Sequence, residues 1–262
     1  MAKTGDVPRS GQRALEVAGR IGFGVNAVQH LLIGIVALQI AWSGAGAQAS
    51  QSGALATVAA QPFGRTLLWL FVAGFAGLAV VHLARAVGAR GHDAASDRAN
   101  AGALTVYYVA LAVLAQQYAQ GSGGGGSSKD VTAGALGLPG GQLLVGAVGL
   151  VIVGIGGYHV WKGVTKGFSD ELDFRDLAGR SGTVLERVAL FGYVTKGLAL
   201  VLVGVLVVIG AVWFDPNAAG GLDTALRTLA GQPFGPWLLS VVALGLIAFA
   251  GYLVVRARRG KV

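Results

Sequence analysis

Residues 188–214 read VALFGYVTKGLALVLVGVLVVIGAVWF, and Lys196 is the only charged side chain among them. A helix crosses the hydrocarbon core of a bilayer with about 20 apolar residues. This segment is therefore long enough and apolar enough to span a membrane. Five further stretches contain no Asp, Glu, Lys or Arg: residues 21–64, 66–84, 99–128, 131–161 and 228–255.

The composition of the whole chain points the same way. Charged residues make up 12% of the 262 residues, whereas a soluble protein has roughly 25%. The hydrophobic share of 54% excludes a disordered chain, and the absence of cysteine excludes disulfides, thiolate metal sites and a cysteine nucleophile. We predict an all-α fold, a six-transmembrane-helix bundle, as a single membrane domain over residues 1–262. The expected helices lie at about residues 20–42, 66–88, 100–120, 141–164, 186–213 and 236–257.

The distribution of Lys and Arg predicts the orientation. Of the 20 basic residues, sixteen fall on the side of the N-terminus, three fall on the opposite side, and Lys196 lies within a span. Cytoplasmic segments carry the excess of Lys and Arg. We therefore expect a multi-pass plasma-membrane protein with both termini in the cytoplasm, and no nucleic-acid binding. A cleaved signal peptide is the alternative for the first helix, since Ala45-Gly46-Ala47 mimics a cleavage site.

The chain contains three copies of one unit. The sequence Gln61–Gly64 (QPFG) recurs at Gln232–Gly235, and the middle copy keeps its proline and last glycine as Pro139 and Gly141. Each copy reads as an outgoing helix, a short helix, a Pro-Gly turn and a returning helix. Because a copy has two spans, all copies point the same way, and we predict three parallel two-helix repeats about a pseudo-threefold axis normal to the membrane. The copies cover about residues 14–88, 95–166 and 183–258.

These motifs together resemble a family of actinobacterial integral membrane proteins that is classed as a domain of unknown function and is built from three two-helix repeats. The resemblance rests on Gly53–Leu55 with Gln61–Arg65, on Gly192–Gly197, and on Ala243–Leu246 with the basic tail that follows. It implies the fold and a plasma-membrane location, and it implies no activity. Similar proteins carry a basic residue where the first copy has Asn26, which is a departure from the family's pattern.

Polar side chains within the expected spans are the candidates for a ligand site. The middle of each expected helix lacks Asp and Glu, which argues against carboxylate proton relays and cation sites. Asn26 and His30 share one face of the first helix, and Asn26 is the repeat equivalent of Lys196. The candidate ligand-binding residues are Asn26, His30, Tyr107, Lys196, His82 and His159. We expect the first four to converge near the pseudo-threefold axis and the last two to lie one layer nearer the cytoplasm.

Lys196 has two interpretations. It lies about 13 Å beyond Arg187 along its helix, at a depth where a lysine costs roughly 2.5–3.5 kcal/mol. Either the side chain reaches the headgroups or backbone carbonyls, or it faces a polar cavity and binds an anionic ligand or a lipid phosphate. For the histidines we expect bonds to carbonyls or headgroups, and we predict no metal site and no cofactor.

Glycines within the spans are expected to allow close helix packing. They are Gly22, Gly24, Gly34, Gly74, Gly77, Gly154, Gly157, Gly192, Gly197 and Gly204. Residues 121–128 are expected to be a flexible linker. Residues 169–176 are expected to form a short helix on the inner membrane surface or a docking site for a cytoplasmic partner.

These residues bear on three classes of function. No nucleophile with a base, carboxylate pair or phosphate-binding loop supports an enzyme. The leading prediction is a membrane component without enzymatic activity, in an accessory, assembly or lipid-binding role, with membrane lipid and a further membrane protein as partners. The alternative is a transporter or channel for a small solute, such as an anion, through a polar cavity containing Lys196. The sequence does not fix the oligomeric state, although three repeats in one chain favour a monomer.

Overall fold

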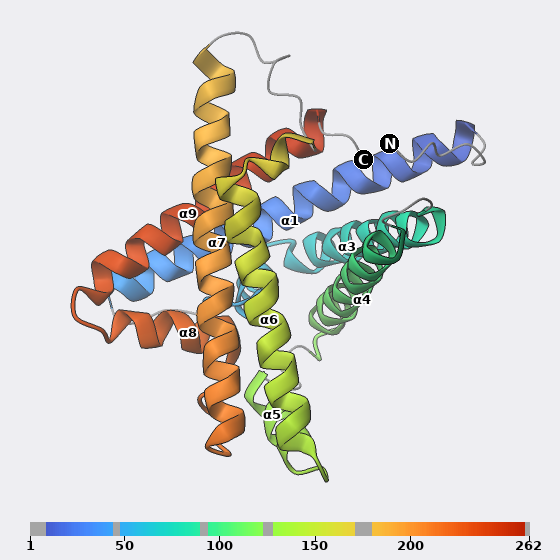
Figure 1. The fold of residues 1–262 in the computed structure, drawn as a ribbon. Helices are drawn as coiled ribbons and strands as arrows, with labels where there is room; N and C mark the ends of the chain where they lie inside the picture. The colour runs from blue at the N-terminus through green and yellow to red at the C-terminus, as the bar shows by residue number, and fades with distance from the viewer. Residues whose placement is uncertain (1–8, 44–47, 90–93, 123–127, 171–179, 260–262) are drawn as a thin grey trace. The chain divides into compact units, whose positions relative to one another are not determined.

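A computed structural model describes residues 9–43, 48–89, 94–122, 128–170 and 180–259. Within these ranges the chain is helices and turns, without strands (Figure 1). The prediction of an all-α protein with six spans is confirmed, and the chain is a multi-pass membrane protein. The helices long and apolar enough to cross a membrane are α1 (Arg9–Ser43), α3 (Gly64–Gly88), α4 (Ala94–Ala119), α6 (Gly141–Val164), α7 (Arg180–Val212) and α9 (Gly235–Arg259).

Three of these helices begin at least six residues earlier than the sequence predicts. α1 starts at Arg9, α4 at Ala94 and α7 at Arg180, where the expected starts are residues 20, 100 and 186. A search for uncharged stretches stops at a charged residue, whereas a helix continues until a residue breaks it. Residues 123–127 of the expected linker and residues 171–176 of the expected surface helix lie outside the described residues; just before the latter, η1 (Gly167–Asp170) forms one 3₁₀ turn.

A short helix joins the two spans of each copy, as predicted. These short helices are α2 (Gln51–Ala59), α5 (Ser128–Leu136) and α8 (Gly221–Ala230). α8 is the most strongly amphipathic, with Asp223 and Arg227 on its polar side. An amphipathic helix of this length gains its stability from packing its apolar face rather than from its own backbone bonds.

The turn after each short helix has the same backbone in all three copies. The residue before the returning helix is left-handed, with φ of 64° at Phe63, 73° at Gly140 and 61° at Phe234. The next residue is a glycine each time, and its N–H donates to the carbonyl three residues earlier at 2.7–2.8 Å. A Cβ on that glycine would collide with a carbonyl oxygen near the end of the short helix. The repeated Gly of the QPFG motif is therefore a steric requirement of the turn.

The contacts within the chain divide it into two compact units. The first unit contains residues 1–28, 58–123 and 253–262, and the second contains residues 29–57 and 124–252. The pseudo-threefold axis and the single membrane domain stay predictions.

In the first unit, α1 and α3 pack through glycines. A Cβ on Gly22 would collide with the side chain of Leu78 and lie 2.6 Å from the carbonyl oxygen of Gly74. A Cβ on Gly74 would lie 2.6 Å from Cγ2 of Val25. Phe75 and Leu78 are completely buried beside this contact, so the glycines let the two helices close over an apolar core.

In the second unit, α6 and α7 lie side by side and pack through glycines spaced seven residues apart (Figure 1). A Cβ on Gly156 would lie 2.7 Å from the carbonyl oxygen of Gly197, and a Cβ on Gly197 would lie 2.7 Å from that of Gly156. Gly149 and Gly204 make the same kind of contact two turns away, at 3.0 and 2.7 Å. Small residues at this spacing allow two membrane helices to approach until their backbones touch.

Two apolar cores hold the second unit together, and α8 contributes to both. Leu226 of α8 belongs to a core with parts of α1, α2 and α9. The preceding residue, Ala225, belongs to a second core with parts of α5, α6 and α7. Because consecutive side chains enter different cores, α8 is fixed on two sides, and its first turn has a defined position relative to α2 and α5.

The packing prediction for the glycines is wrong at three positions. A Cβ on Gly24, Gly154 or Gly157 would meet no atom within 4 Å. Gly154 and Gly157 flank Gly156, so they lie on other faces of α6 than the one that meets α7. The other predicted glycines do face a neighbouring helix within that distance. A glycine on the outer face of a span has the same sequence signal as one at a helix contact, which explains the error.

Candidate functional site

Tyr108 is the centre of the polar group in the first unit. Its hydroxyl accepts a hydrogen bond from Nδ2 of Asn26 at 3.3 Å. The ring of His82 stacks on it, with the centroids 5.4 Å apart and the planes 9° from parallel. Tyr107 meets it edge-on at 5.1 Å. Asn26, His82 and Tyr108 are buried, whereas Tyr107 is 38% exposed, so it is Tyr108 that faces the interior.

Phe249 is the centre of a group in the second unit. The ammonium of Lys196 lies over its ring, 4.1 Å from the centroid. The buried ring of His30 lies 5.0 Å from the same centroid, tilted by 58°. A cation over an aromatic face gains about 0.5–2 kcal/mol, more when it is shielded from water. This contact offsets part of the cost of a lysine within a span.

The last candidate, His159, lies beside Tyr193, which is one turn before Lys196. The ring of His159 lies 6.0 Å from that of Tyr193, and the two planes are 28° apart. The Nδ1 atom of His159 is 2.8 Å from the carbonyl oxygen of Ile155, one turn earlier in the same helix. Phe168 stacks on Tyr193 at 5.5 Å. His159 thus makes the carbonyl bond that the sequence analysis expects of it.

Gln29 is a further buried polar residue that the candidate set does not contain. It is completely buried, and within the described part of the chain its Nε2 and Oε1 have no hydrogen-bond partner. A buried amide without partners costs about 1–3 kcal/mol. Its signal in the sequence is its place beside His30 in an apolar helix.

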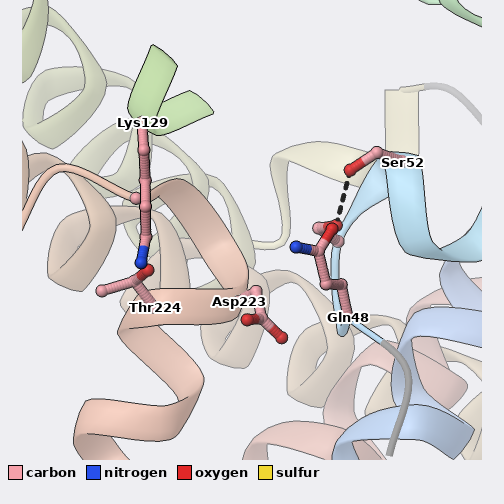
Figure 2. A pocket seen from close by; sticks show the side chains of 7 residues that line it. Gln48, Ser52, Lys129, Asp223 and Thr224 are labelled. Atoms are coloured by element: carbon pink, nitrogen blue, oxygen red, sulfur yellow. Dashed lines mark hydrogen bonds between the residues drawn. The ribbon is translucent and has the colours of Figure 1, made fainter. Parts of the chain in front are cut away.

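A polar cavity of about 140 Å³ lies at the first turns of the short helices. We call it the connector pocket. Figure 2 shows Lys129 extending from α5 toward Thr224 at the start of α8, with Gln48 and Ser52 of the α2 end across from them. The side chains that line it are Gln48, Ser50, Ser52, Lys129, Asp223 and Thr224.

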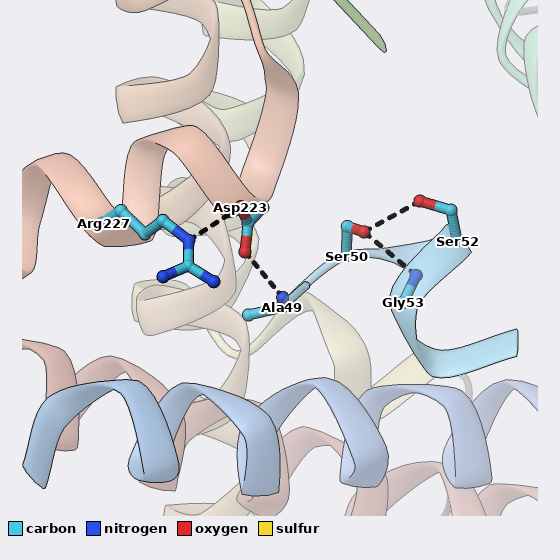
Figure 3. A network of polar contacts seen from close by, with 6 residues as sticks. All are labelled: Ala49, Ser50, Ser52, Gly53, Asp223 and Arg227. Carbon is cyan, nitrogen blue, oxygen red and sulfur yellow. Dashed lines mark hydrogen bonds and ion pairs between the residues drawn. The ribbon is translucent and has the colours of Figure 1, made fainter. Parts of the chain in front are cut away.

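Asp223 binds the start of α2 to α8. Its Oδ1 accepts the N–H of Ala49 at 2.8 Å, and its Oδ2 accepts from Nε of Arg227 at 3.0 Å. On the α2 side, Oγ of Ser50 accepts the N–H of Gly53 at 3.1 Å (Figure 3). A hydroxyl that accepts such an N–H caps the helix start. Both oxygens of Asp223 are thus engaged, and Arg227 balances its charge.

A second cavity, of about 380 Å³, runs between α3 and α4 in the first unit. We call it the α3/α4 groove. Its walls are Val, Ala and Leu side chains apart from Thr105 and Gln116. The hydroxyl of Thr105 donates to the carbonyl of Ala101 at 2.8 Å within α4, which leaves the groove surface beside it apolar.

Each repeat of the chain matches one family model. The matched residues are 21–89, 99–166 and 191–260, and the model is that of the domain of unknown function DUF1206. The chain belongs to this family. The DUF1206 assignment confirms the three repeats of two spans, because one model matches three times along the chain.

A relative outside the actinobacteria matches this DUF1206 chain over most of its length. The uncharacterized protein YxxB of Bacillus subtilis (strain 168) is 29% identical over 244 residues, which cover 91% of this chain and 88% of the relative. No solved structure matches the chain. The resemblance drawn from the sequence is to actinobacterial proteins. This relative shows that similar proteins also occur in Bacillus subtilis.

The DUF1206 repeats identify equivalent positions. The matched segments are 78 and 170 residues apart at their starts, and 77 and 171 apart at their ends. α2 and α5 begin and end 77 residues apart, and α8 ends 171 residues after α2. With these spacings Ser52, Lys129 and Asp223 occupy the same position in the three repeats. All three line the connector pocket.

The same spacings relate the α3/α4 groove to the glycine contact of α6 and α7. Gly156 and Gly197 correspond to Ala79 and Thr105, both of which line the groove. Gly149 and Gly204 likewise correspond to two other residues of its wall, Val72 and Ala112. The side chains are larger at every one of these positions, so α3 and α4 leave a groove where the glycines of α6 and α7 touch.

The DUF1206 spacings also explain why Tyr108 was missed. The first two matched segments start 78 residues apart. With this spacing, Tyr108 in the second repeat is the equivalent of His30 in the first. The choice of Tyr107 rested on depth along the helix, which does not distinguish neighbouring residues on different faces. Within the described residues, groups of three or more His, Asp or Glu with metal-binding geometry are absent.

Proposed function

We propose that this DUF1206 protein is a membrane component without enzymatic activity that binds membrane lipid, with one acyl chain in the α3/α4 groove. The observation that carries the proposal is the groove: an apolar cavity of about 380 Å³ between two membrane spans. Lipid acyl chains are the apolar molecules that surround such helices.

Shape, rather than hydrophobicity, favours retention of the chain in this groove. An acyl chain that moves from the bilayer to the groove exchanges one apolar surrounding for another, so binding depends on van der Waals packing. The repeat-equivalent positions on α6 and α7 are glycines whose backbones touch. The groove is thus a specific feature of α3 and α4 and not of every helix pair.

The environment of the polar candidates supports a non-catalytic role. The ammonium of Lys196 rests on the ring of Phe249, and Nδ1 of His159 lies at a carbonyl of its own helix. The first contact joins α7 to α9, and the second lies within α6. A transport path through Lys196 stays the alternative; neither the connector pocket nor the α3/α4 groove is lined by that residue.

We further propose a plasma-membrane location with both termini in the cytoplasm, supported by the sixteen basic residues on that side. Its partners are membrane lipid and a further membrane protein, and the chain itself is a monomer.

Replacing each of two alanines on α4 by phenylalanine tests the groove. Ala112 lines it, and Ala110 is exposed on the same helix without lining it. Native mass spectrometry of the gently solubilised protein counts the phospholipids it retains. We expect Ala112→Phe to lose one retained phospholipid, because the ring fills the groove, and Ala110→Phe to retain it.

Two outcomes of that measurement contradict the proposal. Equal phospholipid retention by Ala112→Phe and the wild type excludes the groove as the lipid site. Loss of the lipid in Lys196→Met, with retention in Ala112→Phe, assigns it to the Lys196 region and favours the alternative function. The unfolding temperatures of all variants are compared to confirm that each is folded.

A further inference from the structure

The connector pocket receives one residue from each repeat. Ser52, Lys129 and Asp223 are repeat equivalents and differ in chemistry, one neutral, one cationic and one anionic. Their side chains meet at a cavity of about 140 Å³, which has room for several water molecules at about 10–15 Å³ each. Equivalent positions that line one cavity with different side chains make a site that no single repeat contains.

The charge available in the connector pocket is positive. Both oxygens of Asp223 are engaged, by the N–H of Ala49 and by Arg227, at 2.8 and 3.0 Å. The ammonium of Lys129 forms neither an ion pair nor a hydrogen bond to any described residue. Asp130, the neighbour of Lys129, does not line the pocket.

The backbone at the base of the pocket leaves room for Lys129. A Cβ on Gly220 would collide with Oγ1 of Thr224 and lie 2.9 Å from Cε of Lys129. The glycine therefore lets the lysine stem and the threonine hydroxyl come together. Figure 2 shows the ammonium and this hydroxyl at the same end of the pocket, with Ser52 on the far side.

We propose that the connector pocket binds an oxyanion, a phosphate or a carboxylate group, through the ammonium of Lys129 and the hydroxyls of Thr224 and Ser52. Hydrogen bonds from a cation to an oxyanion are about twice as strong as neutral ones, and hydroxyls supply further donors. The pocket lies on the side that the charge distribution predicts to be outside the cell. The group belongs either to a free solute or to the headgroup of an anionic phospholipid.

The test compares two variants, each of which replaces one basic residue by glutamine and so removes one positive charge. Lys129→Gln removes the ammonium proposed to bind the oxyanion, and Arg65→Gln removes an exposed cation that does not line the pocket. Inorganic phosphate is titrated by calorimetry into protein held in nanodiscs of phosphatidylcholine. We expect Lys129→Gln to weaken phosphate binding by about tenfold or more. Arg65→Gln is expected to bind like the wild type, and Lys129→Arg to bind within a few-fold of it.

A second arm identifies the source of the oxyanion. The same proteins are exchanged into nanodiscs of phosphatidylglycerol, and retained lipids are counted by native mass spectrometry. If Lys129→Gln weakens phosphate binding but keeps the retained phosphatidylglycerol, the site takes a free solute. If Lys129→Gln loses a retained phosphatidylglycerol but binds phosphate like the wild type, the site takes a lipid headgroup. If Lys129→Gln and Arg65→Gln match the wild type in both arms, the connector pocket is not an oxyanion site. This result is independent of the α3/α4 groove, which Ala112→Phe tests.

Discussion

Replacing Gly156 by alanine places one methyl group in the contact between α6 and α7. The new Cβ would lie 2.7 Å from the carbonyl oxygen of Gly197, 2.7 Å from the N of Val201 and 2.8 Å from its Cγ2. Carbon contacts are favourable at about 3.5–4.0 Å, so the backbones must separate by several tenths of an ångström or more. Two of the three atoms belong to the backbone, which cannot change rotamer. Overpacking of this kind costs about 1–3 kcal/mol.

The matched control is Gly157→Ala, one residue further along the same helix. A Cβ there would meet nothing within 4 Å, and losing a glycine stabilises by about 0.4–1 kcal/mol through the unfolded chain. In a thermal unfolding assay in one detergent, we expect Gly156→Ala to lower Tm by about 2–12 °C. Gly157→Ala is expected to leave Tm unchanged or slightly raised. Equal Tm values for the two variants would refute the packing argument.

Three further experiments test other parts of the structure in the same unfolding assay. Gly64→Ala forces a Cβ into the carbonyl of Val58, and we expect a loss of about 1–3 kcal/mol; wild-type stability would contradict the steric role of the turn glycine. Asp223→Ala leaves the buried N–H of Ala49 without its acceptor, at a cost of about 1–3 kcal/mol, and an unchanged Tm would show that this bond contributes nothing. A double-mutant cycle of Phe249→Leu with Lys196→Met is expected to give a coupling of about 0.5–2 kcal/mol; zero coupling would remove the cation–ring contact.

The number and order of the helices could be predicted because the signals are strong and local. A span such as residues 188–214 is long, apolar and nearly free of charge, and a helix satisfies all of its backbone hydrogen bonds within the segment inside a bilayer. The QPFG motif marks a turn whose glycine cannot carry a side chain. The starts of α1, α4 and α7 were missed because the apolar character ends at the membrane boundary, whereas each helix includes the charged residues that precede it.

The faces of the helices were harder to predict than their positions. In a helix that is apolar on every side, periodicity does not show which side meets a neighbour. Gly154 and Gly156 are both glycines in one span, and only Gly156 touches another helix. Tyr107 and Tyr108 differ by one residue, and only Tyr108 is buried.

The burial of several polar candidates could be predicted, whereas their partners could not. Asn26, His30 and His82 are buried polar groups, as their place in apolar spans indicates. Their contacts with aromatic rings depend on helices far apart in the sequence. Lys196 had two interpretations, and its position over Phe249 belongs to neither. The connector pocket was missed because Ser52, Lys129 and Asp223 have no common chemistry, and only the repeat spacing connects them.

The central claim is that the chain consists of three copies of one two-span unit inserted in the same direction. Because the protein has no cysteine, a single introduced cysteine reports its own position without background. Gln61, Leu138 and Gln232 are exposed and equivalent in the three turns, and Val87 and Thr165 are exposed at the opposite ends of their helices. With a membrane-impermeant maleimide on intact cells, we expect the three turn cysteines to be labelled alike, and those at Val87 and Thr165 only after permeabilisation. A turn cysteine that behaves differently from the other two would contradict the account.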